Sequence, residues 1–187
     1  MLVFLSAFTI SPKVPAIAYG GPETAPDQPS PESHKLTESL ILVEFVAEIY
    51  PNANLLPNDP VLRAKARFFI DSFSNKFSPH YMSWVRGGPV EEYYTAVDAV
   101  QALLPLNEKW AVGDQFTIAD VAAASFFARA RVVLKNGLRS LAANGEDWEG
   151  SYKAFLSDPK YARYNKYVED LLSRDTVKAT FDEVCRS

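Results

Sequence analysis

The most regular hydrophobic pattern in the chain lies in residues 35–51, which read KLTESLILVEFVAEIYP. Apolar residues recur there three or four positions apart, which is the period of an α-helix, at Leu36, Leu40, Val43, Ala47 and Tyr50. A second apolar stripe leaves only a narrow polar strip at Glu44 and Glu48. A helix as apolar as this is expected to be buried and packed on two sides.

Three polar residues, Thr37, Glu38 and Ser39, stand where this helix begins. The backbone N–H groups of a first helical turn have no partner within the helix, and the positive end of the helix dipole lies there too. Such a position favours a carboxylate ligand. The alternative is that Thr37 or Ser39 only caps the helix, because serine and threonine are common N-cap residues.

The segment before this helix has the pattern of a short sheet. Residues 14–19 read as a strand, which ends at Gly20-Gly21-Pro22. The proline-rich residues up to Ser33 are expected to form a surface loop, and Lys35–Thr37 a short last strand. The apolar residues 1–10 could supply a further strand.

From residue 58 onward the periodicity is helical throughout. Asp59-Pro60 is an N-cap followed by proline at the first helical position. The helix that begins there is expected to reach Phe77 and to bury Ala64, Phe68 and Ile70–Phe73. Ser78-Pro79 is expected to end it. Further helices are predicted over residues 80–86, 91–104, 118–134, 158–172 and 176–184.

The segment 113–120, GDQFTIAD, is the clearest helix start in the chain. Thr117 is the predicted N-cap, and Asp120 three residues later can reach back to it, close to the capping-box pattern. A catalytic role for the Asp120 carboxylate is the alternative, but we favour the structural role for both residues.

Composition narrows the functions available to the chain. The net charge is −4 with no basic run, which argues against nucleic acid as a partner. A single cysteine, Cys185, forms no intrachain disulfide and fits a reducing, cytoplasmic compartment. It lacks a basic partner that would activate it, so we do not expect it to be a nucleophile.

No metal site and no membrane segment are expected. Two histidines and one cysteine are too few for a convincing metal-ligand cluster, and no apolar run approaches the length of a membrane helix. The apolar start MLVFLSAFTI has no lysine or arginine before Lys13, so it lacks the charged region of a secretory signal peptide.

Several motifs in order resemble the glutathione transferase family. These are KVPAIAY and KLTESLILVEFVAEIYP, then LLPNDPVLRAKARFFID and GDQFTIADVAAASFFA, and the resemblance extends over residues 13–187. The proline-rich loop GGPETAPDQPSPESHK is similar to that of a fungal class related to the bacterial glutathione-dependent β-etherases.

The resemblance implies a mainly α fold with two domains. Residues 1–52 would form a truncated thioredoxin-like α/β piece, and residues 58–187 the all-helical C-terminal domain. The piece is expected to be truncated because twelve residues before Lys13 cannot hold a strand, a helix and a second strand. A truncated gene product and a wrong first exon both explain this.

The resemblance also implies how glutathione would be held as cosubstrate. In the family, the backbone of the residue before a cis proline pairs with the cysteinyl unit, which here indicates Val14 and Pro15. A Glu-Ser pair holds the γ-glutamyl end, which here is Glu38 and Ser39. The residue that activates the thiol would lie before Lys13, where the hydroxyls are Ser6, Thr9 and Ser11, so the catalytic residue stays unknown.

Aromatic residues of the helical half suggest a site for a hydrophobic substrate. Phe77, Tyr81, Trp84 and Tyr94 are expected to wall a cleft for small aromatic compounds, although aromatic residues at helical spacing are more often core. Three functions remain open: a glutathione transferase or ether-cleaving enzyme, a non-catalytic binder of polyphenols, and a protein-interaction module. A homodimer is among the expected assemblies.

Overall fold

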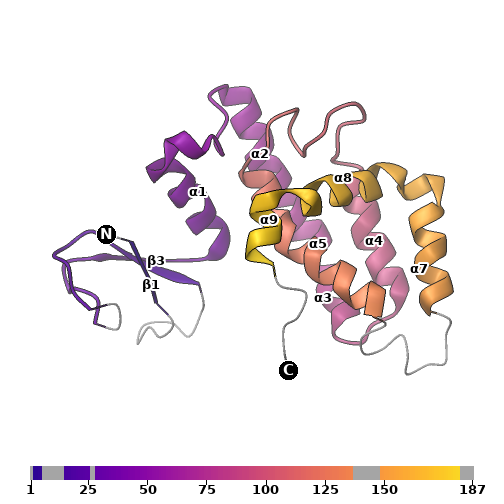
Figure 1. Cartoon of the computed structure of the whole chain (residues 1–187), viewed down its shortest axis with the longest axis horizontal. Helices are drawn as coiled ribbons and strands as arrows, with labels where there is room; N and C mark the ends of the chain where they lie inside the picture. The colour runs from indigo at the N-terminus through magenta and orange to yellow at the C-terminus, as the bar shows by residue number, and fades with distance from the viewer. Residues whose placement is uncertain (1, 6–14, 26–27, 137–147, 182–187) are drawn as a thin grey trace. The chain divides into compact units, whose positions relative to one another are not determined.

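The chain folds into two compact units that meet in sequence between Leu56 and Pro57. The computed structural model describes residues 2–5, 15–25, 28–136 and 148–181 (Figure 1). The fold is mainly α, with one small sheet in the N-terminal unit, residues 1–56, and helices throughout the C-terminal unit, residues 57–187. This agrees with the predicted fold class.

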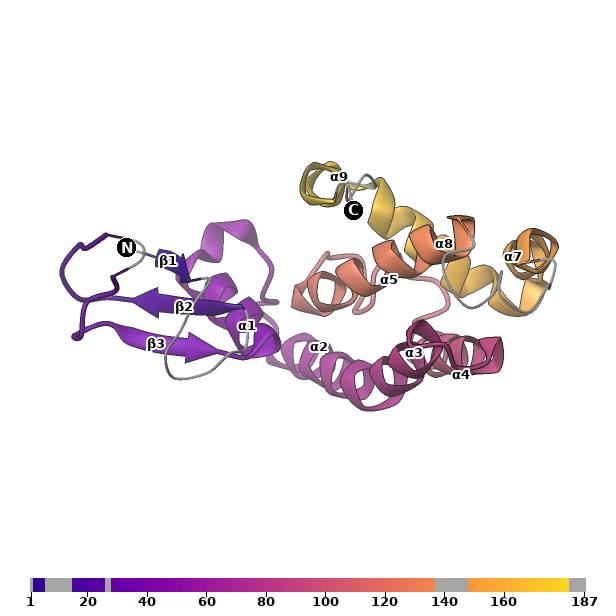
Figure 2. The same ribbon diagram turned by 90° about the horizontal axis from the view of Figure 1, so that it is seen from below.

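The sheet of the N-terminal unit has three antiparallel strands in the order β1-β2-β3, seen side by side in Figure 2. They are β1 (Leu2–Leu5), β2 (Ala16–Tyr19) and β3 (His34–Thr37). Ala16, Ile17 and Ala18 are all buried. Because successive side chains of a strand point to opposite faces, both faces of β2 are covered.

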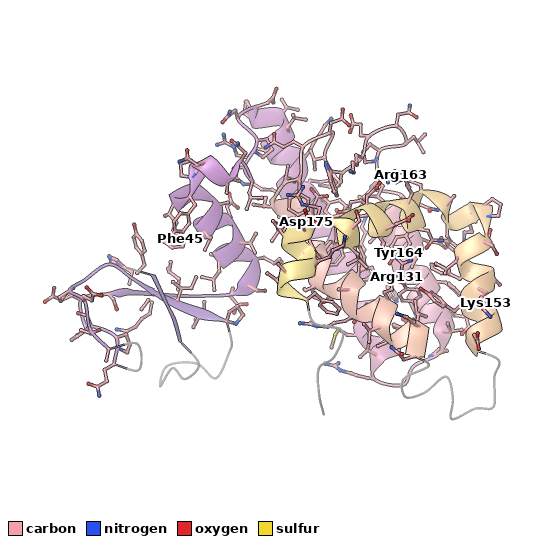
Figure 3. The ribbon with its side chains drawn as sticks, in the orientation of Figure 1. Phe45, Arg131, Lys153, Arg163, Tyr164 and Asp175 are labelled. Carbon is pink, nitrogen blue, oxygen red and sulfur yellow. The ribbon has the colours of Figure 1, made fainter. Side chains whose placement is uncertain are left out.

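Helix α1 (Ser39–Ile49) begins one residue after β3 and packs on β2 and β3. Only Leu42 and Ala47 are buried, while 62% of Ile41 is exposed. The prediction of a helix packed on two sides is therefore wrong for the described residues, because the sheet covers only one side of α1. Phe45, labelled in Figure 3, adds an edge contact to Tyr19 with ring centres 5.1 Å apart.

The loop between β2 and β3 is folded more tightly than a simple surface loop. Ser33 donates from its backbone N–H and from its hydroxyl to the carbonyl of Ser30, at 3.0 and 2.7 Å, and both residues are buried. Gly21 has φ +72, and a Cβ there would lie 3.1 Å from the Ser33 nitrogen. The positive φ and the crowding explain why glycine stands at this position.

In the C-terminal unit, α2 (Pro60–Ser72), a π segment η2 (Phe73–Phe77) and α3 (Ser78–Val85) form one continuous helix. The predicted end at Ser78-Pro79 is therefore wrong. The Ser78 N–H donates to the Phe73 carbonyl five residues earlier, and Pro79 lies in the first turn of α3. The wider π turn keeps the helix going past a proline that lacks an N–H.

The buried face of this long helix differs from the predicted one. Ala64 and Phe68 are exposed, and Ala66 and Phe69 are buried in their place. Phe73, which the sequence predicts to be buried, is buried together with Phe77. The sequence offers an aromatic residue at both position 68 and position 69, and packing against α5 selects the second. Successive rings at positions 69, 73, 77 and 81 stack with their centres 6.3, 4.6 and 5.4 Å apart.

The other helices complete a bundle around α5 (Ile118–Asn136), which packs against α2 and α8 on its two sides (Figure 2). They are α4 (Val90–Gln101), α7 (Trp148–Ser157), the short 3₁₀ turn η3 (Pro159–Tyr161), α8 (Ala162–Ser173) and α9 (Asp175–Thr180). Phe127 of α5 lies near the centre and meets Phe73, Phe77 and Tyr164 edge-on.

No described helix is long and apolar enough to cross a membrane. No group of three or more histidine, cysteine, aspartate or glutamate residues that could hold a metal ion occurs within the described ranges.

Candidate functional site

The pairing of β2 with β3 builds the candidate site in the N-terminal unit. The register places Ala16 opposite Thr37. Ala16 directly follows Pro15, and Thr37 directly precedes Glu38, so the last pair of the register marks the end of the sheet from which both residues leave. Both residues are exposed. One end of the sheet thus joins the start of β2, the end of β3 and the beginning of α1.

Glu38 has an unusual backbone conformation. Its φ is 72° and its ψ is 111°, and it directly precedes α1. A residue with a side chain rarely adopts positive φ, and holding it there costs about 1–3 kcal/mol. Such strain concentrates at ligand sites and switch regions, which makes the turn from β3 into α1 the strongest candidate site of this unit.

Ser39 is the first residue of α1, and its side chain is exposed. The N-cap is Glu38, and in the described structure no side chain forms a capping hydrogen bond there. The alternative in which Thr37 or Ser39 caps this helix is therefore wrong. The first helical hydrogen bond runs from the Leu42 N–H to the Glu38 carbonyl at 3.0 Å. The amides of the first turn point away from the helix body and suit an anionic group.

Other residues predicted for this site lie outside the described ranges. Val14, the expected partner of the cysteinyl unit, is one of them. Ser6, Thr9 and Ser11, the hydroxyls closest to the expected position of the thiol-activating residue, are the others. Pro15, Glu38 and Ser39 are the predicted residues of this site that lie within the described ranges. Cys185, which is not predicted for this site, also lies outside the described ranges.

The aromatic wall predicted for the C-terminal unit is mostly core. Phe77, Tyr81 and Trp84 have exposed fractions of 0%, 3% and 2%. The rings of Phe77 and Tyr81 stack, and the Tyr81 and Trp84 rings meet at a tilt. Phe126 of α5 meets the first two rings edge-on. The prediction that these three side chains line an open cleft is wrong for this structure, because the bundle covers them within their own unit.

Tyr94, the fourth predicted cleft residue, is half-buried on α4. Its ring packs on Phe155 and stacks on Tyr161, with centres 5.8 Å away in both cases. It therefore covers one side of the bundle near α7 and η3. Burial raises the pKa of its phenol, so the group stays neutral near pH 7.

The segment around Thr117 and Asp120 forms the most densely hydrogen-bonded polar cluster of the C-terminal unit. Asp120 Oδ2 accepts from the Thr117 N–H at 2.8 Å and from its hydroxyl at 3.2 Å, while the Ala119 N–H donates to the Thr117 hydroxyl at 3.3 Å. Asp120 Oδ1 accepts from the Ala111 N–H at 2.9 Å and from the Tyr167 hydroxyl at 2.8 Å.

The Asp120 carboxyl is fully buried. Burial raises its pKa above the ordinary value, while the hydrogen bonds from Ala111, Thr117 and Tyr167 act in the opposite direction. A carboxyl so enclosed has no face left for a substrate, so its environment supports a structural role. Its bonds to Ala111 and Tyr167 tie α5 to the preceding segment and to α8.

Residues 105–117, the segment that leads into α5, are held from α8 as well. Arg163, labelled in Figure 3, donates to the backbone carbonyls of Pro105 at 2.7 Å and Glu108 at 2.8 Å. The guanidinium of Arg174 lies 3.9 Å from the centre of the Phe116 ring. The sequence pattern gave no signal for these contacts, because the partners are more than fifty residues apart.

Most of the chain is similar to proteins of known family or structure. Residues 84–170 match the family model described as glutathione S-transferase, C-terminal domain. The crystal structure of glutathione transferase Omega 1C from Trametes versicolor is 51% identical, with a TM-score of 0.80 over 91% of this chain and 71% of that one. Omega 2S from the same fungus, in complex with 2,4-dihydroxybenzophenone, is 40% identical, with a TM-score of 0.78 over 90% of this chain and 72% of that one.

Among curated sequences, a probable glutathione S-transferase from Nicotiana tabacum is 27% identical over 127 residues. This match covers 65% of the chain and 51% of the relative. The chain thus spans about half of the length of the curated relatives that it matches.

Proposed function

Since this chain belongs to the glutathione transferase family, we propose that its N-terminal unit binds glutathione at the turn from β3 into α1. The register that pairs Ala16 with Thr37, and so brings the start of β2 to the turn into α1, is the observation that carries the proposal. It brings the peptide backbone at the start of β2 close to a helix start, which suits a carboxylate. Glutathione offers both a peptide backbone and a carboxylate, because it is a tripeptide with a zwitterionic γ-glutamyl end.

We assign each end of the site to one part of glutathione. The Ser39 hydroxyl and the first amides of α1 donate to the γ-glutamyl carboxylate. The Glu38 carboxylate accepts from the α-ammonium group, and its positive φ of 72° sets the direction of the side chain. The backbone before Pro15, which includes Val14, pairs with the cysteinyl unit.

The reaction we propose is transfer of the glutathione thiol to a small aromatic electrophile. The thiolate attacks an electrophilic carbon, a new C–S bond forms, and the leaving group departs with its electron pair. In an ether-cleaving version, the leaving group is an aryloxide. A free thiol has a pKa of about 8.5 and needs a group that stabilises the thiolate. The described residues offer no such group at this site, so the proposal assigns none.

The second candidate function is non-catalytic binding of polyphenols or related aromatic compounds. It is favoured by the relative from Trametes versicolor that holds 2,4-dihydroxybenzophenone. Turnover separates the two functions. An enzyme consumes glutathione and an aromatic electrophile together, whereas a binder retains the aromatic compound unchanged.

A cytoplasmic location and a homodimer are part of the same proposal. Val61 on α2 is 62% exposed and would be partly covered in a dimer. Sedimentation equilibrium tests the assembly. A protein-interaction role would be favoured if the chain bound neither glutathione nor aromatic compounds.

Titration calorimetry with glutathione tests the site directly. We expect Ser39→Ala to weaken binding about tenfold or more, because a charge-assisted hydrogen bond contributes about 1.5–3 kcal/mol. Ser78→Ala, which removes a hydroxyl from the first residue of α3, is the matched control and should bind like wild type. Unchanged glutathione affinity in Ser39→Ala, combined with a loss of stability, would mean that Ser39 serves only the fold.

A further inference from the structure

A pocket of about 220 Å³ opens within the C-terminal unit, between α2 and residues 103–113. Its walls are mainly apolar and include Leu62, Phe69, Leu103 and Val112. Two charged residues of opposite sign, Lys65 and Glu108, complete the lining. A cavity of this size is small for a drug-sized compound and suits a ligand built on a single ring.

Residues 103–113, which form one side of the pocket, are held in place by hydrogen bonds. Arg163 binds the carbonyls of Pro105 and Glu108, at 2.7 and 2.8 Å, and the Ala111 N–H donates to the buried Asp120. The Trp110 N–H donates to the Gly113 carbonyl at 3.0 Å. A wall fixed by such bonds needs little ordering when a ligand enters, which lowers the cost of binding.

The charges define the kind of ligand. Lys65 is exposed and forms no ion pair or side-chain hydrogen bond with any residue that the structure describes. Its ammonium is therefore available to a carboxylate. Glu108 would repel a ligand that is only an acid, so the ligand must also bring a hydrogen-bond donor to that side.

Phe68 also lines the pocket, and 62% of its surface is exposed. When a flat apolar ligand covers a large solvent-exposed aromatic side chain, the burial of apolar surface lowers the free energy of the complex. The pocket therefore combines an exposed ring, an apolar floor, one cation and one anion.

We propose that this pocket is a second binding site of the protein, for a single-ring aromatic acid that carries a hydroxyl or amino substituent. The ring lies against Leu62 and Phe68, the carboxylate pairs with Lys65, and the substituent donates a hydrogen bond to Glu108. The site is independent of the proposed glutathione site, since none of its residues belongs to the N-terminal unit.

The probe for this site is 4-hydroxybenzoate, followed by nuclear magnetic resonance on ¹⁵N-labelled full chain without glutathione. We expect saturable shifts in the amides of Leu62–Phe69 and of Gly113. Lys65→Met should weaken binding about tenfold or more through loss of the charged partner, and Lys65→Arg should retain most of it. Lys76→Met removes an ammonium farther along the same continuous helix and should bind like wild type.

Changes to the probe test the two polar contacts separately. Methyl 4-hydroxybenzoate lacks the carboxylate and should lose sensitivity to Lys65→Met. In contrast, 4-methoxybenzoate lacks the donor, so Glu108→Gln, which removes the repelling charge, should strengthen its binding. Absence of saturable binding by the wild type overturns the proposal, and so does equal affinity in Lys65→Met. Displacement of the probe by glutathione would place it at the other site and would also overturn it. Failure of glutathione to bind leaves each of these results unaffected.

Discussion

Tyr167 donates its hydroxyl hydrogen to Oδ1 of Asp120 across 2.8 Å, although the two residues are 47 positions apart in the chain. Both are fully buried, so the bond joins α8 to the first turn of α5 inside the bundle. Burial raises the pKa of the Tyr167 phenol well above its ordinary value, and the nearby Asp120 carboxylate adds to the rise. The phenol therefore remains a hydrogen-bond donor throughout the neutral pH range.

Removal of this hydroxyl tests its contribution to stability. We expect Tyr167→Phe to lower the free energy of unfolding by about 1–3 kcal/mol, because it leaves a buried acceptor with one partner fewer. Urea denaturation measures the change. Tyr94→Phe removes a hydroxyl from a half-buried tyrosine of the same unit and should change stability by less than about 0.5 kcal/mol. Equal effects of the two substitutions would contradict the importance of the bond.

The buried Asp120 also predicts a pH dependence. Its pKa is raised on folding above the unfolded value of about 4. A raised pKa means that folding favours the protonated carboxyl, so this contribution to stability is full below pH of about 4 and is lost as the pH rises through the folded pKa.

Asp120→Asn isolates this effect, because asparagine does not titrate. The variant should be less stable than wild type, since its amide N–H₂ group replaces one of the two oxygens and must face a donor, either Ala111 N–H at the Oδ1 position or Thr117 N–H at the Oδ2 position. The stability difference between the two proteins should narrow as the pH is raised from about 3 to about 7. A difference that widens over this range would show that the hydrogen bonds outweigh burial and that the pKa is lowered.

The strained backbone of Glu38 predicts opposite effects on stability and binding. Glycine adopts positive φ without strain, so Glu38→Gly should raise the free energy of unfolding by about 1 kcal/mol. The same change removes the carboxylate proposed to hold the α-ammonium group, and glutathione affinity should fall. Thermal denaturation and titration calorimetry measure the two effects.

Asn54 provides the matched control for this substitution. It is the other described residue with a side chain and positive φ, at 51°, and asparagine tolerates that conformation well. Asn54→Gly should change stability less than Glu38→Gly and should not affect glutathione binding. Loss of stability in Glu38→Gly would mean that contacts of the side chain outweigh the strain.

Limited proteolysis tests the order of the N-terminal loop. Residues 20–25 are mostly exposed, whereas Ser30 and Ser33 are buried in a turn. We expect a protease of broad specificity to cut within residues 20–25 well before it cuts in α5. Mass spectrometry of early fragments locates the first cut. Cleavage first between Ser30 and Ser33 would contradict the buried turn.

The features that can be predicted from the sequence are those set by neighbouring residues. Asp59 caps α2 by accepting from the Val61 and Leu62 N–H groups, and the Asp-Pro pair predicts this directly. The Thr117–Asp120 contact spans three residues and has the spacing of a capping box. Local spacing fixes both contacts, so no knowledge of the fold is needed.

The features that cannot be predicted depend on partners far away in the chain. The choice between Phe68 and Phe69 for the buried face of α2 is made by α5, some fifty residues later. The positive φ of Glu38 results from joining a paired strand to a helix within one residue. The aromatic residues expected to line a cleft are core because the helical period alone does not distinguish a buried partner from a ligand.

The π segment at Phe73–Phe77 has a consequence for the alignment of the aromatic rings along the long helix. In a regular α-helix, four residues turn about 400°, so side chains four apart drift by about 40° at each step. A π turn needs more residues to complete one rotation about the helix axis. Four residues of a π turn therefore rotate by less than a full turn, and the side chains drift in the opposite direction. The π segment therefore keeps the side chains of Phe77 and Tyr81 on the same side of the helix as Phe69, the first ring of the stack. Deletion of one residue from Phe73–Phe77 would convert the turn to regular helix and rotate Tyr81, Trp84 and everything after them by about 100° away from α5.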